Sequence, residues 1–164
     1  MVQQRALVLS AFPGTGKTTL FETVEGFKKP DSSEKPSYIP VILDSDSSKF
    51  SWIRPGERHP DFPNNYIEHI KENLATADVI LTSTHKVVRD ALREAGINFT
   101  IVFPLTNCKE HYLQRYIDRG SPESFVNLMD NNWDNFIAEL EEDPNPEKLR
   151  LVENHFIKDL MIIE

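Results

Sequence analysis

Eight residues near the start of the chain have the types and spacing needed to bind phosphate. Residues 11–18 are Ala-Phe-Pro-Gly-Thr-Gly-Lys-Thr, the P-loop pattern with alanine in place of its first glycine. Glycines let successive backbone N–H groups turn toward phosphate oxygens, and the positive amino end of a following helix points at the same anion. The segment therefore predicts a phosphate site between a strand and a helix.

Each polar residue of this segment has an expected task. Lys17 is expected to contact the β and γ phosphates of a nucleotide, and Thr18 to offer its hydroxyl to Mg²⁺. Thr15 and Thr19 are expected to support the loop or cap the helix. The residues predicted to hold the nucleotide are Pro13, Gly14, Thr15, Gly16, Lys17, Thr18 and Thr19.

A pair of carboxylates, Asp44 and Asp46, follows the apolar run 38–43. Ligands of α/β proteins bind at the carboxyl ends of strands, where two carboxylates can divide the tasks of serving Mg²⁺ and orienting an acceptor hydroxyl. A simple turn, favoured by Asp and Ser, is the alternative. The apolar residues 79–81 are followed by Thr-Ser-Thr and not by the usual metal-side aspartate, so Asp44 is the best replacement.

Two arginines, Arg115 and Arg119, are spaced four residues apart in the predicted helix 109–119. This spacing puts both side chains on one helix face, from which they can reach the same ligand. The alternative is a solvated basic face paired with Glu110 or Asp118. Further candidates for binding an acceptor phosphate are Arg54, Arg58, Lys86 and Arg89.

Short apolar runs alternate with amphipathic segments along the chain, which predicts an α/β fold. Strands are expected at 5–10, 38–43, 78–81, 99–103 and 149–152. Helices are expected at 17–27, 66–74, 86–95, 109–119, 123–140 and 156–163. The proline-rich segment 51–65 is expected to be an irregular lid or substrate loop, and Ser121 and Pro122 to be the cap and first residue of a helix. The predicted architecture is a three-layer parallel sheet flanked by helices, with a helical insertion at about 107–141.

Length and composition set the broad class of the protein. The 164 residues fit one domain, and no apolar run approaches the roughly 18 residues of a membrane span. A single cysteine favours a reducing compartment, so a cytoplasmic protein is expected. The net charge of -8 weighs against a nucleic-acid partner, which would require a cationic surface.

With these motifs the chain resembles the P-loop kinases of the nucleoside monophosphate kinase and shikimate kinase type. The resemblance is tight at residues 11–18 and at Asp44-Ser45-Asp46. It implies the P-loop NTPase fold with a helical lid, and ATP and Mg²⁺ as cofactors. It also implies that Asp44 serves the metal and that Asp46 holds the acceptor hydroxyl or acts as base. Arg115 and Arg119 correspond to lid arginines that stabilise transition-state charge.

The sequence therefore predicts an ATP-dependent phosphotransferase that acts on a small acceptor, a nucleotide or nucleoside. The acceptor is expected between Asp46, the segment 50–58 and the helical lid. A polynucleotide 5′-hydroxyl kinase and a non-catalytic NTP-binding switch are the alternatives. No motif specifies the acceptor, the donor base or the oligomeric state.

Overall fold

The computed structural model describes residues 4–30, 38–45, 52–54, 57–152 and 155–160. Within these ranges several side chains, including those of Thr18, Arg54 and Arg58, lie outside the description. The described residues form a main sheet of five parallel strands in the order β2-β5-β1-β6-β7. These strands are β1 (Leu7–Ala11), β2 (Ile42–Asp44), β5 (Val79–Thr82), β6 (Phe99–Pro104) and β7 (Lys148–Leu151).

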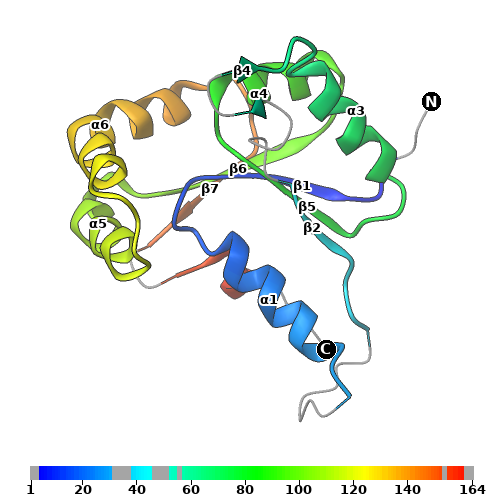
Figure 1. The fold of residues 1–164 in the computed structure, drawn as a ribbon, viewed down its shortest axis with the longest axis horizontal. Helices are drawn as coiled ribbons and strands as arrows, with labels where there is room; N and C mark the ends of the chain where they lie inside the picture. The colour runs from blue at the N-terminus through cyan, green and yellow to red at the C-terminus, as the bar shows by residue number, and fades with distance from the viewer. Residues whose placement is uncertain (1–3, 31–37, 46–51, 55–56, 153–154, 161–164) are drawn as a thin grey trace.

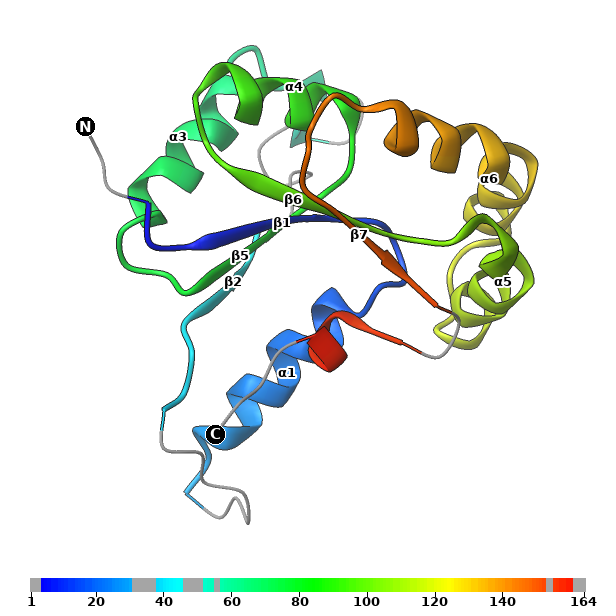
Figure 2. The same ribbon diagram turned by 180° about the vertical axis from the view of Figure 1, so that it is seen from behind.

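Helices cover both faces of the main sheet, which makes the protein a three-layer α/β structure (Figure 1). Helix α1 lies on one face together with the 3₁₀ turn η2, and α3 and α4 lie on the other (Figures 1 and 2). Between β6 and β7 the chain forms a pair of helices, α5 and α6. The helical elements are α1 (Lys17–Phe27), α3 (Asn64–Asn73), α4 (Lys86–Glu94), η1 (Thr106–Cys108), α5 (Lys109–Asp118), α6 (Glu123–Glu142) and η2 (Ile157–Leu160).

Successive strand residues face opposite layers, because side chains alternate along a strand. Val8 belongs to the hydrophobic cluster that α3, α4, α5 and α6 cover, whereas Leu9 belongs to the cluster that includes Leu20 and Val24 of α1. Both faces of β1 are therefore buried, as expected for a central strand of a parallel sheet.

The segment before Asp44 and the segment after it differ from the sequence prediction. Strand β2 is shorter than the predicted range 38–43, because Tyr38 is exposed and Pro40 has no N–H for a ladder. The segment 51–65 is not wholly irregular: Trp52–Arg54 (β3) pairs antiparallel with Glu57–Arg58 (β4).

Two helix boundaries also differ from the prediction. Pro122 is the N-cap of α6 and not its first helical residue, because its ψ of 145° is extended. In place of a terminal helix over 156–163, the described residues form only the short turn η2. The N–H of Ile157 donates instead to Thr15 O at 2.9 Å, which ties this segment to the predicted P-loop. Among the described helices, none has the length and apolar character that crossing a membrane requires.

From the carboxyl ends of the neighbouring strands β1 and β6, the chain continues toward opposite edges of the sheet. From β1 the chain continues through α1 to β2, and from β6 it continues through α5 and α6 to β7, at the opposite edge of the sheet. Such a topological switch point opens a crevice outside the carboxyl ends of the strands, where ligands of α/β proteins bind. The predicted phosphate loop begins at this crevice.

Candidate phosphate-binding site

The loop 12–16 joins the end of β1 to the start of α1. Its first residue is anchored to the sheet, because Phe12 N donates to Val102 O of β6 at 2.9 Å. Gly14 and Gly16 have positive φ angles of 87° and 97°. Thr15 lies between them, fully buried, and its hydroxyl donates to Phe12 O at 2.7 Å. Thr15 thus closes the turn from inside.

Both glycines are also places of close packing. A Cβ atom on Gly14 would lie 2.9 Å from Cε1 of Tyr116, and one on Gly16 would lie 3.0 Å from Cδ1 of Phe156. Side chains therefore do not fit here, and left-handed backbone would strain them in any case. The loop is held between α5 and the segment that follows β7.

The start of α1 provides the positive end of the site. Lys17 Nζ donates to Ala11 O at 3.1 Å, so the ammonium lies over the loop itself. Thr19 has an exposed side chain on the same turn, and the side chain of Thr18 lies outside the described part of the chain. The first N–H groups of a helix have no acceptor within the helix, so this end attracts anions.

The two predicted arginines line the same cavity as Lys17. Arg115 Nη1 donates to Gly14 O at 2.8 Å, and its guanidinium is stacked between the rings of Tyr112 and Phe156, with centroids 4.2 and 4.1 Å from Cζ. Arg119 donates from Nε to the hydroxyl of Ser121 at 3.0 Å. Both arginines therefore line one cavity with the loop, and Arg115 is in direct contact with the loop.

Two tyrosines that contact the loop were missed by the sequence analysis. Tyr116 donates its hydroxyl to Pro13 O at 2.8 Å, and Tyr112 packs against Gly14. Burial raises the pKa of Tyr116 well above its ordinary value, so its hydroxyl stays a donor even in alkaline solution. Their i,i+4 spacing on the helix that carries Arg115 was the available signal, but it is equally typical of core residues.

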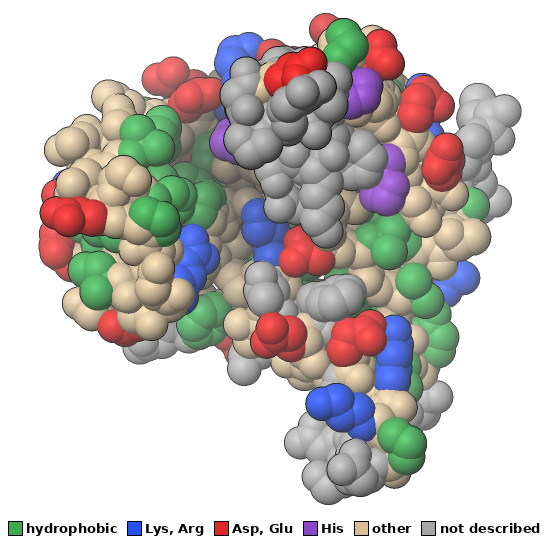
Figure 3. Space-filling model, in the orientation of Figure 1, with side chains coloured by type: hydrophobic (Ala, Val, Ile, Leu, Met, Phe, Trp, Pro, Cys, Tyr) green, Lys and Arg blue, Asp and Glu red, His purple; other side chains and the backbone are tan. Residues whose placement is uncertain are grey.

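These residues surround a cavity of about 910 Å³, here called the phosphate cavity. Figure 3 shows the hollow between the α5–α6 pair and the body of the protein, with basic side chains on both of its sides. Its described lining consists of Pro13, Gly14, Gly16, Lys17, Thr19, Arg115, Asp118, Arg119, Phe125 and Phe156. The cavity combines a cationic wall, a loop with two left-handed glycines and a helix amino terminus, which is the chemistry that phosphate groups require.

The predicted aspartate pair is only partly described. Asp44 ends β2 beside Leu81, which in turn pairs with Leu9 of β1, so two strand spacings, about 10 Å, separate Asp44 from β1. It is not among the described residues that line the phosphate cavity. Asp46 lies outside the described residues. The predicted division of labour between the two carboxylates therefore remains a prediction.

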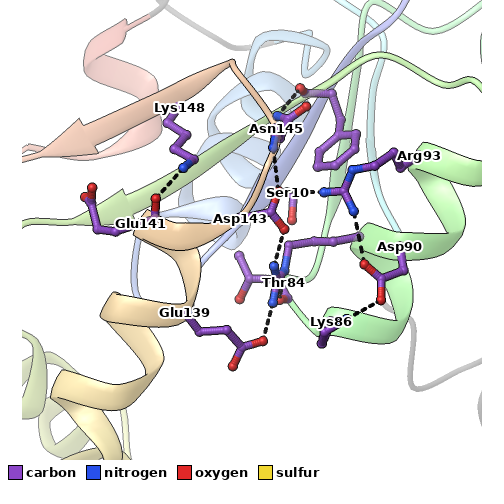
Figure 4. A network of polar contacts seen from close by, with 12 residues as sticks. Ser10, Thr84, Lys86, Asp90, Arg93, Glu139, Glu141, Asp143, Asn145 and Lys148 are labelled. Atoms are coloured by element: carbon purple, nitrogen blue, oxygen red, sulfur yellow. Dashed lines mark hydrogen bonds and ion pairs between the residues drawn. The ribbon is translucent and has the colours of Figure 1, made fainter.

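Of the four basic residues proposed to bind an acceptor phosphate, Arg89 already uses its side chain in contacts within the protein. Its guanidinium is buried and donates to Thr84 O at 2.8 Å, to Glu139 at 2.5 Å and to Asp143. Figure 4 shows the network in which Glu139 and Asp143 take part. Lys86 is paired with Asp90 on the surface at 2.6 Å. The side chains of Arg54 and Arg58 lie outside the described part of the structure.

Comparison with known proteins gives no family for the chain. No protein-family model matches it, and no curated protein is significantly similar to it. Among solved structures, one described as "Crystal structure of APE1195" is 16% identical, with 94% of this chain and 88% of that chain covered and a TM-score of 0.37. At that TM-score and identity, the likeness supports no conclusion about fold or activity.

Proposed function

We propose that the protein binds ATP with its phosphates in the phosphate cavity and transfers the γ-phosphoryl group to a small acceptor, a nucleotide or nucleoside. The observation that supports this most is the convergence of cations from two separate elements on one glycine turn. Lys17 comes from the start of α1, and Arg115 and Arg119 come from α5. Phosphoryl transfer depends mainly on such positioned charge, because the transition state spreads negative charge over the phosphoryl oxygens.

In the proposed reaction an acceptor oxygen, from a nucleoside hydroxyl or a nucleotide phosphate, forms a bond to the γ phosphorus. The bond from that phosphorus to the bridging β–γ oxygen breaks and ADP leaves. When the acceptor is a hydroxyl, its proton passes to a base, for which Asp46 is the sequence candidate. Lys17 and the two arginines would neutralise the charge on the oxygens of the transferred group. Phe125 and Phe156 on the cavity wall offer apolar ring surface to the rest of the donor.

Magnesium is proposed as the accompanying metal. The sequence candidates for holding it, the Thr18 hydroxyl and the Asp44 carboxylate, are hard oxygen donors of the kind that Mg²⁺ prefers. When bound, the ion would neutralise phosphate charge. The described atoms do not bring the two donors together, so no step is assigned to the metal. A cytoplasmic location is also proposed, and the single, buried Cys108 is compatible with it.

The test is ADP formation from ATP with a panel of nucleosides, nucleoside monophosphates and 5′-hydroxyl oligonucleotides. We expect turnover with a nucleoside or a monophosphate, and loss of most of it in Lys17→Ala with the fold retained. Lys28→Ala is the matched control, because this lysine is exposed and paired only with Glu25 in the described structure. Turnover of oligonucleotides alone would favour the polynucleotide kinase. ATP binding without turnover of any acceptor would favour the non-catalytic switch, and failure to bind ATP would overturn the proposal.

A further inference from the structure

A second cavity, of about 290 Å³, lies directly beside the phosphate cavity. Pro13 and Phe125 line both cavities, so they form a common wall. On its other sides the second cavity is bounded by the residues that connect β5 to α4 and by α6. A molecule held in it would therefore lie next to a phosphate bound at the loop.

Most of the surface of the second cavity is apolar. Its apolar lining comprises Phe12, Pro13, Phe125, Leu128, Met129, Phe136 and Leu140. Leu128 is 51% exposed in spite of its apolar side chain. The volume is at the lower end of the roughly 300–1,000 Å³ range of small-molecule sites, which fits one or two rings. A flat, apolar ring system is the shape and chemistry that these walls accept.

The charged groups of the second cavity are already matched by opposite charges. Arg89 is bound by Glu139 and Asp143, and Lys86 is bound by Asp90. A ligand phosphate placed next to Arg89 would have to displace a carboxylate from it, and Asp143 is itself buried. Leaving a buried charge without its partner is costly, so a ligand that carries its own phosphate is disfavoured here.

We propose that the second cavity is the acceptor site and that its ligand is an uncharged nucleoside. This inference rests on the proposed phosphotransferase, and it places the acceptor elsewhere than the predicted site beside Asp46. The base that takes the proton of the acceptor hydroxyl is then a group of this cavity, for which His85 is the candidate in place of Asp46. The nucleobase would lie against the apolar walls and the sugar would lie toward Pro13 and Phe125, with its 3′-hydroxyl facing the phosphate cavity and its 5′-carbon facing Arg89. His85 and Thr84 at the start of α4 supply polar groups for orientation.

The inference is tested by calorimetric titration of five nucleosides (adenosine, guanosine, cytidine, uridine and thymidine) and of their 5′-monophosphates. Each titration is made with and without a saturating non-hydrolysable ATP analogue, so that binding at the phosphate cavity is separated from binding at the second cavity. We expect at least one nucleoside to bind in the presence of the analogue, and its monophosphate to bind more weakly by about tenfold or more.

Two substitutions locate this binding. Leu128→Trp adds bulk to a partly exposed wall residue and should weaken nucleoside binding by about tenfold or more, with affinity for the ATP analogue unchanged. Glu139→Gln removes one carboxylate from Arg89 and should reduce the difference in binding affinity between the nucleoside and its monophosphate. Glu142→Gln makes the same change farther along α6, at a residue that is not part of the described lining. This control variant should leave the difference in affinity between nucleoside and monophosphate unchanged.

Three results would overturn the inference: no nucleoside binds to the parent protein, the monophosphate binds more tightly, or Leu128→Trp binds the nucleoside as the parent does. These results differ from failure of the proposed function. That failure appears as loss of ATP binding in the parent, or as unchanged ATP turnover in Lys17→Ala. Nucleoside binding by calorimetry does not depend on turnover, so each hypothesis can fail alone.

Discussion

The guanidinium of Arg115 is predicted to shape the phosphate loop as well as to face its ligand. It donates to Gly14 O and is stacked between Tyr112 and Phe156. Lysine lacks the planar group for both contacts, so Arg115→Lys should weaken ATP binding by roughly tenfold, since hydrogen bonds to charged groups contribute about 1.5–3 kcal/mol. Arg119→Lys is the matched comparison and should lower turnover more than affinity. Equal affinity losses in both variants, measured by calorimetry, would contradict this difference.

A second prediction concerns Gly16 and the ring of Phe156. Gly16→Ala should lower the free energy of unfolding by roughly 1–2 kcal/mol from left-handed backbone alone, and further through the contact with the ring. The cost should be smaller in a Phe156→Ala background, where only the backbone part remains. Urea denaturation of the parent, the two single variants and the double variant measures the cost of Gly16→Ala in both backgrounds. An identical cost in both backgrounds would show that the ring does not press on the loop.

The residues of the candidate phosphate site divide into those that the sequence could predict and those that it could not. Lys17 and the glycines were predictable, because their types and order are fixed by how a backbone wraps around phosphate. Arg115 and Arg119 were predictable as a pair from helical spacing. The ring of Phe156 was not, because its contact with Gly16 joins residues 140 positions apart, and no local pattern encodes such a contact.

Helices α4 and α6 are joined by the buried guanidinium of Arg89. It links the backbone at Thr84 to Glu139 and Asp143 at the end of α6. Arg89→Met should lower the free energy of unfolding by about 3–5 kcal/mol, because Asp143 would stay buried and lose a partner. The double variant Arg89→Met with Asp143→Leu should recover part of that loss. Chemical denaturation provides the measurement, and a double variant less stable than the single one would contradict the explanation.

Most elements were predicted well, including the short strands β5 and β6, whereas β2 and the β3–β4 pair were not. Helices α4 and α5 lie close to their predicted ranges, since apolar residues recur at the helical period. Strand β2 was predicted too long because its apolar run continues through Tyr38, whose hydroxyl in fact donates to Asp78 outside the ladder. The hairpin of β3 and β4 offered no turn signal beyond Pro55-Gly56 within a proline-rich segment.

The arrangement of the strands across the sheet was beyond the sequence analysis. Alternation of strands and helices predicts parallel strands, but it does not say that β5 lies between β2 and β1, or that β6 lies beside β1. That order creates the switch point at which the phosphate loop meets α5. The position of the second cavity depends on the same long-range packing, because its walls come from the phosphate loop, the β5–α4 connection and α6.

Resistance of the protein to acid is predicted to depend in part on Asp143. Burial on its own would raise the pKa of this carboxyl, but hydrogen bonds from Asn145 N, Arg89 and Arg93 outweigh burial and hold the pKa below its ordinary value. A carboxyl with a lowered folded-state pKa stabilises the protein above its unfolded-state pKa, about 3.9 for Asp, and loses this contribution as the pH falls through the folded-state pKa.

The free energy of unfolding of the parent should therefore decrease as the pH is lowered below about 4. In the double variant Arg89→Met with Asp143→Leu this decrease should be shallower, because one titrating group is gone while the other carboxylates of the protein remain in place. Urea denaturation at a series of pH values from neutral to strongly acidic measures both curves. Parallel curves would mean that Asp143 has the same pKa in the folded and unfolded protein, and that the network of α4 and α6 does not stabilise its charge.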